Sequence, residues 1–145
     1  MTTTPTIDMT FVQAAHLLAT HLTGHALPEP ACLEVISKPG RSRVTAQVHS
    51  LTVPGIAAEL LTWADTLTTV TIHAWRPPCG DRVHLSMASS LSEHTDTVEL
   101  TIFGGADHDP ALVGELAPGE YRSVTLSELR TWATDTPHPL LLTRR

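Results

Sequence analysis

The chain has 145 residues, of which 41% are hydrophobic and 17% are charged. This length is typical of one domain, and the composition excludes an intrinsically disordered chain. The formal net charge of −6 argues against nonspecific nucleic-acid binding, which requires a basic surface. We therefore expect a single domain over 1–145, with short loose tails at 1–6 and 136–145.

The cysteine content and the hydrophobic pattern indicate in which cellular compartment the protein is expected. Two cysteines, Cys32 and Cys79, are too few for a disulfide framework. No apolar run approaches the ~18 residues of a membrane-spanning helix, and the N-terminus lacks the features of a signal peptide. These observations predict a cytoplasmic protein without a membrane partner. The nine histidines, whose protonation would move the charge from −6 to +3, reflect either the codon bias of a GC-rich genome or a pH sensor.

The first predicted element is a helix over 8–23. Asp8 is placed to accept hydrogen bonds from the free N–H groups of the first turn, and Gly24 follows as a stop signal. The apolar residues recur at helical spacing and form one stripe: Phe11, Ala14, Ala15, Leu18 and Leu22. The pattern predicts a helix that packs one face against a core.

A β-hairpin is predicted next, with strands at 31–37 and 43–50 and a turn at Pro39 and Gly40. Its second strand alternates apolar and polar residues, which predicts that one face is buried. The polar side of this strand carries Arg43, Thr45, Gln47 and His49.

A second helix is expected over 53–67. Thr52 is a suitable N-cap residue, and Pro54 is tolerated in the first turn. Leu51 and Ile56 have the spacing of a hydrophobic staple, which supports a helix start at this point.

Three strands follow at 69–76, 82–89 and 97–103, each with apolar residues at alternate positions. Short polar loops join them, which predicts an antiparallel meander. The stretch 104–110 is interpreted as a loop because it contains two glycines, two aspartates and a proline.

The last part of the chain is expected to hold a turn of helix within 111–118, an edge strand at 120–125 and a helix over 126–134. Thr125 and Glu128 have the spacing of a capping box, so the start of this helix is clearly signalled. Because consecutive strands dominate the order α-β-β-α-β-β-β-(β)-α, we predict an α+β fold. It comprises about three helices and a largely antiparallel sheet of five to six strands, built from the hairpin and the three-strand meander.

The polar face of the meander is the most informative surface. A four-residue loop between the first and second meander strands would set Trp75 opposite His84. Counting residues in the same way across the loop between the second and third strands would set His84 opposite Phe103. With His73 and His49 this row is the candidate binding site, a stacking or peptide-binding platform. Alternatively, a helix or a partner subunit covers the face, or the pairs only stabilise the sheet.

Weaker constellations occur elsewhere. His21 and His25 have the i, i+4 spacing of two histidines that bind one metal ion from a helix. However, a glycine lies between them and the acidic residue of the H-E-x-x-H motif is missing. The alternative interpretation is that both histidines belong to a solvated polar face of the helix. His108 lies between two aspartates in the predicted loop, and Cys79 lies in a turn; both are interpreted as loop residues. We therefore assign no catalytic residue, no metal ligand and no cofactor.

No phosphate loop, G-x-S-x-G elbow or other catalytic motif occurs in the chain. The leading hypothesis is thus a non-enzymatic accessory module that binds a protein partner, or itself as a homodimer, through the sheet face or an edge strand. The alternative is a small-molecule-binding or hydrolytic domain in which His49, His73 or His84 acts with an acidic residue such as Glu99. Nucleic-acid binding is the weakest hypothesis because of the negative charge.

Overall fold

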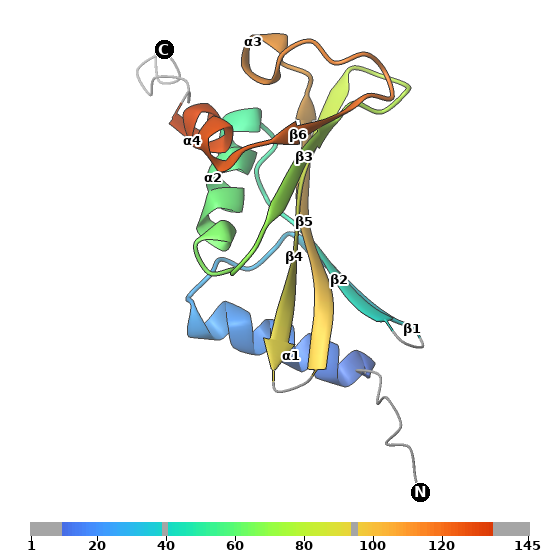
Figure 1. The fold of residues 1–145 in the computed structure, drawn as a ribbon, viewed down its shortest axis with the longest axis vertical. Helices are drawn as coiled ribbons and strands as arrows, with labels where there is room; N and C mark the ends of the chain where they lie inside the picture. Colours follow the sequence, from blue (N-terminus) through green and yellow to red (C-terminus); the bar gives the residue numbers. More distant parts are fainter. Residues whose placement is uncertain (1–9, 39–40, 94–95, 135–145) are drawn as a thin grey trace, which may run out of the picture.

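The computed structural model describes residues 10–38, 41–93 and 96–134, and over these residues it contains one six-stranded sheet and four helices (Figure 1). The strands are β1 (Cys32–Lys38), β2 (Arg41–Gln47), β3 (Thr71–Trp75), β4 (Arg82–Glu93), β5 (Asp96–Asp107) and β6 (Tyr121–Val124). The helices are α1 (Phe11–Gly24), α2 (Val53–Ala64), α3 (Pro110–Val113) and α4 (Leu126–Thr134). The predicted α+β class is confirmed. The predicted tails and the turn at Pro39 and Gly40 lie outside the described residues.

Helix α1 starts later than expected because a different residue caps it. Thr10 Oγ1 accepts a hydrogen bond from the N–H of Gln13 at 3.1 Å, and the Gln13 side chain accepts one from the N–H of Thr10 at 2.8 Å. This reciprocal pair is a capping box, with glutamine in the place of glutamate. The predicted cap, Asp8, lies outside the described residues. The predicted apolar stripe is wrong at Phe11, which is 56% exposed.

The starts of α2 and α4 are confirmed. Thr52 Oγ1 accepts a hydrogen bond from the N–H of Gly55 at 3.1 Å. Thr125 Oγ1 accepts one from the N–H of Glu128 at 3.0 Å, and Glu128 Oε1 accepts one from the N–H of Thr125 at 3.0 Å. Each cap satisfies backbone donors that the first turn leaves without an intrahelical partner. None of the helices in the described part of the chain is long and apolar enough to span a membrane.

The strand order is β1-β2-β5-β4-β3-β6. The hairpin β1–β2 and the meander β3–β4–β5 are antiparallel as predicted, and β6 lies at the edge beside β3. The parallel pair β2–β5 was not expected from the sequence. It arises because the connection through α2 carries the chain from β2 across the sheet to β3, which leaves β2 free to pair with the last strand of the meander.

Strand β5 continues through the region predicted as a loop. Gly104 and Gly105 lie within the strand, which ends only at Asp107. A Cβ atom at Gly104 would lie 2.7 Å from Cγ2 of Val48 and 2.9 Å from Cγ1 of Ile56. The glycine therefore permits close approach of α2 to the strand backbone, and it does not mark a turn.

One face of the sheet holds the core. Alternate residues of the central strands are buried: Val44, Ala46, Val83, Leu85, Met87, Val98, Leu100 and Ile102. Helix α1 contacts β1, β2 and β4, helix α2 contacts β4 and β5, and α4 packs on α2. Figure 1 shows α2 and α4 together on one side of the sheet.

The side chains of the intervening residues point to the other face, because successive residues of a strand alternate between the faces, and they are half-buried or exposed. We call this surface the open face. Its side chains include Arg43, Thr45, Gln47, Thr71, His73, Trp75, Arg82, His84, Ser86, Glu99, Thr101, Phe103, Asp107, Tyr121 and Ser123. The sequence left open that a helix covers this face. Among the described residues no helix does so.

Candidate functional site

Four directly opposed residues form a row across the open face, on β6, β3, β4 and β5. Trp75 pairs with Tyr121 on one side and with His84 on the other, and His84 pairs with Gly105. The ring centroids of Trp75 and Tyr121 are 5.5 Å apart with an interplanar angle of 21°, and those of Trp75 and His84 are 5.5 Å apart with an angle of 40°. We call Tyr121, Trp75 and His84 the aromatic row. It forms one continuous surface of three rings.

The predicted register is correct for one pair and wrong for the other. Trp75 lies opposite His84 as expected. Phe103 lies opposite Ser86 on β4 and Gln47 on β2, two residues away from the position predicted for it. The physical reason is the position of the connection between β4 and β5: the last pair of the hairpin is Glu93–Asp96, one residue later in the chain than the predicted register implies, so β5 is displaced by two residues relative to β4. A shift by two keeps Phe103 on the open face, diagonal to His84.

Sequence reasoning missed Tyr121. The edge strand that carries it was predicted, but its neighbour in the sheet was not, since β6 and β3 are far apart in the chain. The available signal was a single aromatic residue at the start of that strand, 65% exposed in the structure.

Gly105 completes the row by leaving room for His84. A Cβ atom at this glycine would lie 3.1 Å from Cε1 of His84 and 3.3 Å from Nη2 of Arg82. Burial of the imidazole, and then the nearby charge of Arg82, lower the pKa of His84 below its ordinary value. The row therefore presents a neutral imidazole at neutral pH, next to two larger aromatic rings.

Two ion pairs join charged residues across neighbouring strands of the open face. Arg82 Nη1 lies 3.2 Å from Asp107 Oδ1, next to the row, and Arg43 Nη2 lies 3.8 Å from Glu99 Oε1. These side chains are between 43% and 92% exposed, so the pairs add little to stability. The Arg82–Asp107 pair places charges of both signs beside the aromatic row, and the Arg43–Glu99 pair lies farther along β5.

The other two predicted site residues have different positions. His73 lies on the open face opposite Ser86 and is a diagonal neighbour of His84. His49 does not lie on the open face, because β2 ends at Gln47. Its Nε2 lies 3.0 Å from the carbonyl oxygen of Glu29, and its N–H donates to Glu59 Oε1 at 3.3 Å, beside α2.

A hydrolytic site of the kind considered above needs an imidazole and a carboxylate within hydrogen-bond reach of one substrate. Glu99 is six residues along β5 from Gly105, the partner of His84, which corresponds to roughly 20 Å of extended strand. Glu99 is also paired with Arg43. The predicted histidines and this glutamate are thus spread over the sheet.

The weaker candidates are also separated from the row. Both ring nitrogens of His108 are buried and have no hydrogen-bond partner among the described residues, so they do not face solvent. Cys32 and Cys79 are exposed free thiols. In the described part of the chain, no group of three or more His, Cys, Asp or Glu residues is arranged to hold a metal ion.

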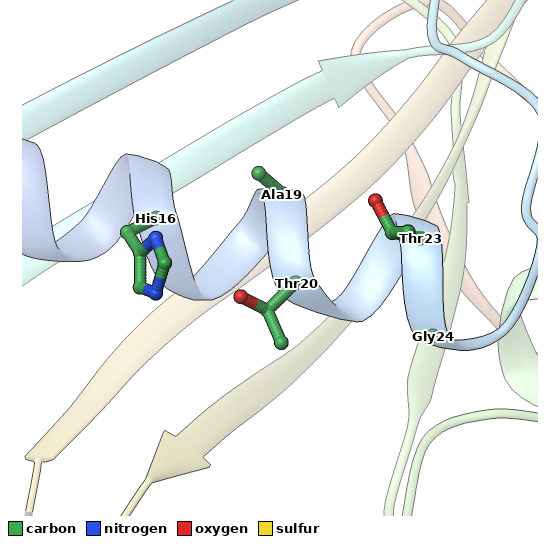
Figure 2. Close-up of a pocket in the computed structure, with 5 residues that line it drawn as sticks. All are labelled: His16, Ala19, Thr20, Thr23 and Gly24. Atoms are coloured by element: carbon green, nitrogen blue, oxygen red, sulfur yellow. The ribbon is translucent and has the colours of Figure 1, made fainter.

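A hollow of about 450 Å³ runs along the outer side of α1, where Figure 2 shows His16, Ala19, Thr20, Thr23 and Gly24. All five residues come from one helix, so no second element contributes a converging polar group. We therefore place the candidate site at the aromatic row. Comparison of the chain with protein-family models, curated proteins and solved structures finds no match, so its function is inferred from this geometry alone.

Proposed function

We propose that this chain is a small cytoplasmic accessory module that binds a protein partner, or a second copy of itself, through the open face of its sheet. The observation that carries the proposal is the aromatic row of Tyr121, Trp75 and His84 on a face that α1, α2 and α4 leave uncovered. Tryptophan and tyrosine are enriched among the few residues that dominate binding energy in protein interfaces.

The chemistry of the row fits association with protein better than with charged polymers. The rings offer a large contact area at a small cost in side-chain entropy, because each has two torsions to fix. The lowered pKa of His84 keeps its ring neutral, so that covering it with a partner requires no desolvation of a charge. The ion pairs Arg82–Asp107 and Arg43–Glu99 would form part of a polar rim. The net charge of −6 disfavours nucleic acid as the partner.

The test compares Trp75→Ala with a matched surface variant, Leu51→Ala, which truncates a side chain that is 69% exposed outside the open face. Self-association is measured by size-exclusion chromatography with light scattering over a range of concentrations. Partner binding is measured by quantitative pull-down from the native host. We expect Trp75→Ala to weaken either association at least tenfold and Leu51→Ala to leave it unchanged.

A second variant, Tyr121→Ala, removes the neighbouring ring on a different strand and should weaken the same association. A strictly monomeric chain whose Trp75→Ala and Tyr121→Ala variants retain every partner would refute the proposal. Far-UV circular dichroism of each variant verifies that the sheet is intact.

A further inference from the structure

A second feature lies away from the aromatic row, where the end of α1 meets the turn after α2 and the far part of β4. A hollow of about 470 Å³ is present there. Two imidazoles and several hydroxyl groups line it, among them His21, His25, Thr66, Thr68, Ser90 and Ser92. Three separate elements thus contribute polar groups to this hollow, whereas the hollow on the outer side of α1 is lined by residues of that helix alone.

The hydrogen bonds of Thr66 determine which nitrogen of His21 carries the proton. Thr66 Oγ1 donates its only hydrogen to the carbonyl oxygen of Trp63 at 2.7 Å. Nε2 of His21 lies 2.8 Å from Thr66 Oγ1, which has no second hydrogen to donate, so Nε2 must be the donor in this contact. The neutral His21 ring therefore has its lone pair on Nδ1. The ring also stacks on Trp63, with centroids 6.3 Å apart at an angle of 20°.

This arrangement is typical of imidazoles that bind metal ions. A metal-binding histidine usually donates the N–H of its second nitrogen to a fixed acceptor, which sets the tautomer and orients the ring. Thr66 supplies that acceptor for His21. Burial, and then the proximity of His25, lower the pKa of His21. Its Nδ1 lone pair is consequently available at neutral pH.

His25 lies beside His21 at a distance that suits a shared ion. Their ring centroids are 4.5 Å apart with an interplanar angle of 49°. Two imidazoles at adjacent positions of a square-planar ion, with metal–nitrogen distances of about 2.0 Å, have centroids roughly 4.5 Å apart. Tetragonal geometry with nitrogen and oxygen ligands is characteristic of Cu²⁺ and Ni²⁺.

We propose that His21 and His25 bind a divalent transition-metal ion, preferentially Cu²⁺, through two neutral imidazoles, with water and the hydroxyl groups of the hollow around its other positions. No third His, Cys, Asp or Glu joins them in the described part of the chain, so the ion is exchangeable and keeps open coordination positions. This site is independent of the interaction proposed for the open face.

The test uses the full chain, freed of metal with a chelator and titrated with Cu²⁺, Ni²⁺ and Zn²⁺ by isothermal calorimetry. His25→Asn removes one exposed ligand without disturbing the contacts of His21 with Thr66 and Trp63. His16→Asn is the matched control, because His16 lies on the same helix five residues before His21, which corresponds to about 140° around the helix axis. We expect one Cu²⁺ site that His25→Asn weakens at least tenfold and His16→Asn leaves unchanged.

Two further measurements separate this site from scattered binding to surface histidines. Electron paramagnetic resonance of the Cu²⁺ form should show coupling to two imidazole nitrogens in the wild type and to one in His25→Asn. Thr66→Val, which removes the acceptor for Nε2 of His21, should weaken Cu²⁺ binding about tenfold or more. Equal Cu²⁺ affinity in the wild type, His25→Asn and His16→Asn would overturn the proposal.

Discussion

The imidazole of His84 lies against the backbone of Gly105, so that a methyl group on this glycine would come within 3.1 Å of Cε1 of the ring. The preceding residue, Gly104, faces the opposite side of the sheet, where a methyl group would lie 2.7 Å from Cγ2 of Val48. Two adjacent glycines thus permit close packing on the two faces of one strand, the first with α2 and the second with the aromatic row.

This difference predicts that the same substitution, glycine to alanine, costs more stability at Gly104 than at Gly105. Gly104→Ala forces a methyl group into the close-packed core and should lower the free energy of unfolding by about 1–3 kcal/mol. At Gly105 the nearest atoms to a new methyl group lie 3.1 Å or more away and belong to the side chains of His84 and Arg82 on the open face, so a shift of a few tenths of an ångström accommodates it and the cost should stay below about 1 kcal/mol. Chemical denaturation of both variants gives the comparison, and a larger loss for Gly105→Ala would contradict it.

The stability of the protein should fall as the pH is lowered through the range in which His21 titrates. The pKa of His21 is lowered in the folded state by burial and by His25, so below about pH 6.5 the unfolded chain takes up its proton first. The loss of stability ends once the pH is below the folded-state pKa.

Urea denaturation between pH 7.5 and pH 5, in the presence of a chelator, measures this slope. His21→Gln should flatten it, and adding His84→Gln should flatten it further, because the pKa of His84 is also lowered by burial and by Arg82. An unchanged slope in the double variant would contradict the prediction.

Glu128 should also contribute stability that is lost as the pH falls, but in a more acidic range than His21. Its pKa is lowered by the hydrogen bond from the backbone N–H of Thr125 and then by that from Arg122 Nη1, which lies 2.9 Å from Oε2. The contribution is therefore complete above the unfolded-state pKa, near 4.5, and is lost as the pH falls through the lower folded-state value.

Glu128→Gln keeps an acceptor for the cap but removes the charge, so it should be less stable than the wild type at pH 7, and this difference should be smaller at pH 3. Thr125→Ala removes the reciprocal half of the capping box and should cost about 1 kcal/mol. Thermal denaturation at the two pH values provides the measurement. A stability difference for Glu128→Gln that is as large at pH 3 as at pH 7 would show that packing, and not the charge, was lost.

Replacing His108 should make the protein more stable. Both of its ring nitrogens are buried without a hydrogen-bond partner among the described residues, and an unsatisfied buried polar group is costly. His108→Leu removes these atoms at similar volume and should raise the free energy of unfolding by about 1 kcal/mol. His108→Gln, which retains buried polar atoms, should bring no such gain. A loss of stability in His108→Leu would indicate that water satisfies the ring.

Local patterns in the sequence were sufficient for several parts of the fold. The capping pair Thr125–Glu128 and the cap Thr52 depend on residues three positions apart, so their geometry follows from the chain itself. The register that sets Trp75 opposite His84 follows from a short connection between neighbouring strands. Alternation of apolar residues identified the buried and the open sides of the meander strands.

Other features depend on contacts between segments that are distant in the chain, which no local propensity encodes. The parallel pairing of β2 with β5 and the position of β6 beside β3 are of this kind, and the latter brings Tyr121 against Trp75. Gly104 and Gly105 resemble a turn when taken alone, and only the packing of Ile56 and His84 on either side explains glycines within a strand. The sequence by itself therefore determined the class of the fold, the starts of α2 and α4 and one pair of the aromatic row. Tertiary structure decided the third ring, the glycine beneath His84 and the alignment of His21 with Thr66, because each requires two elements to be packed together.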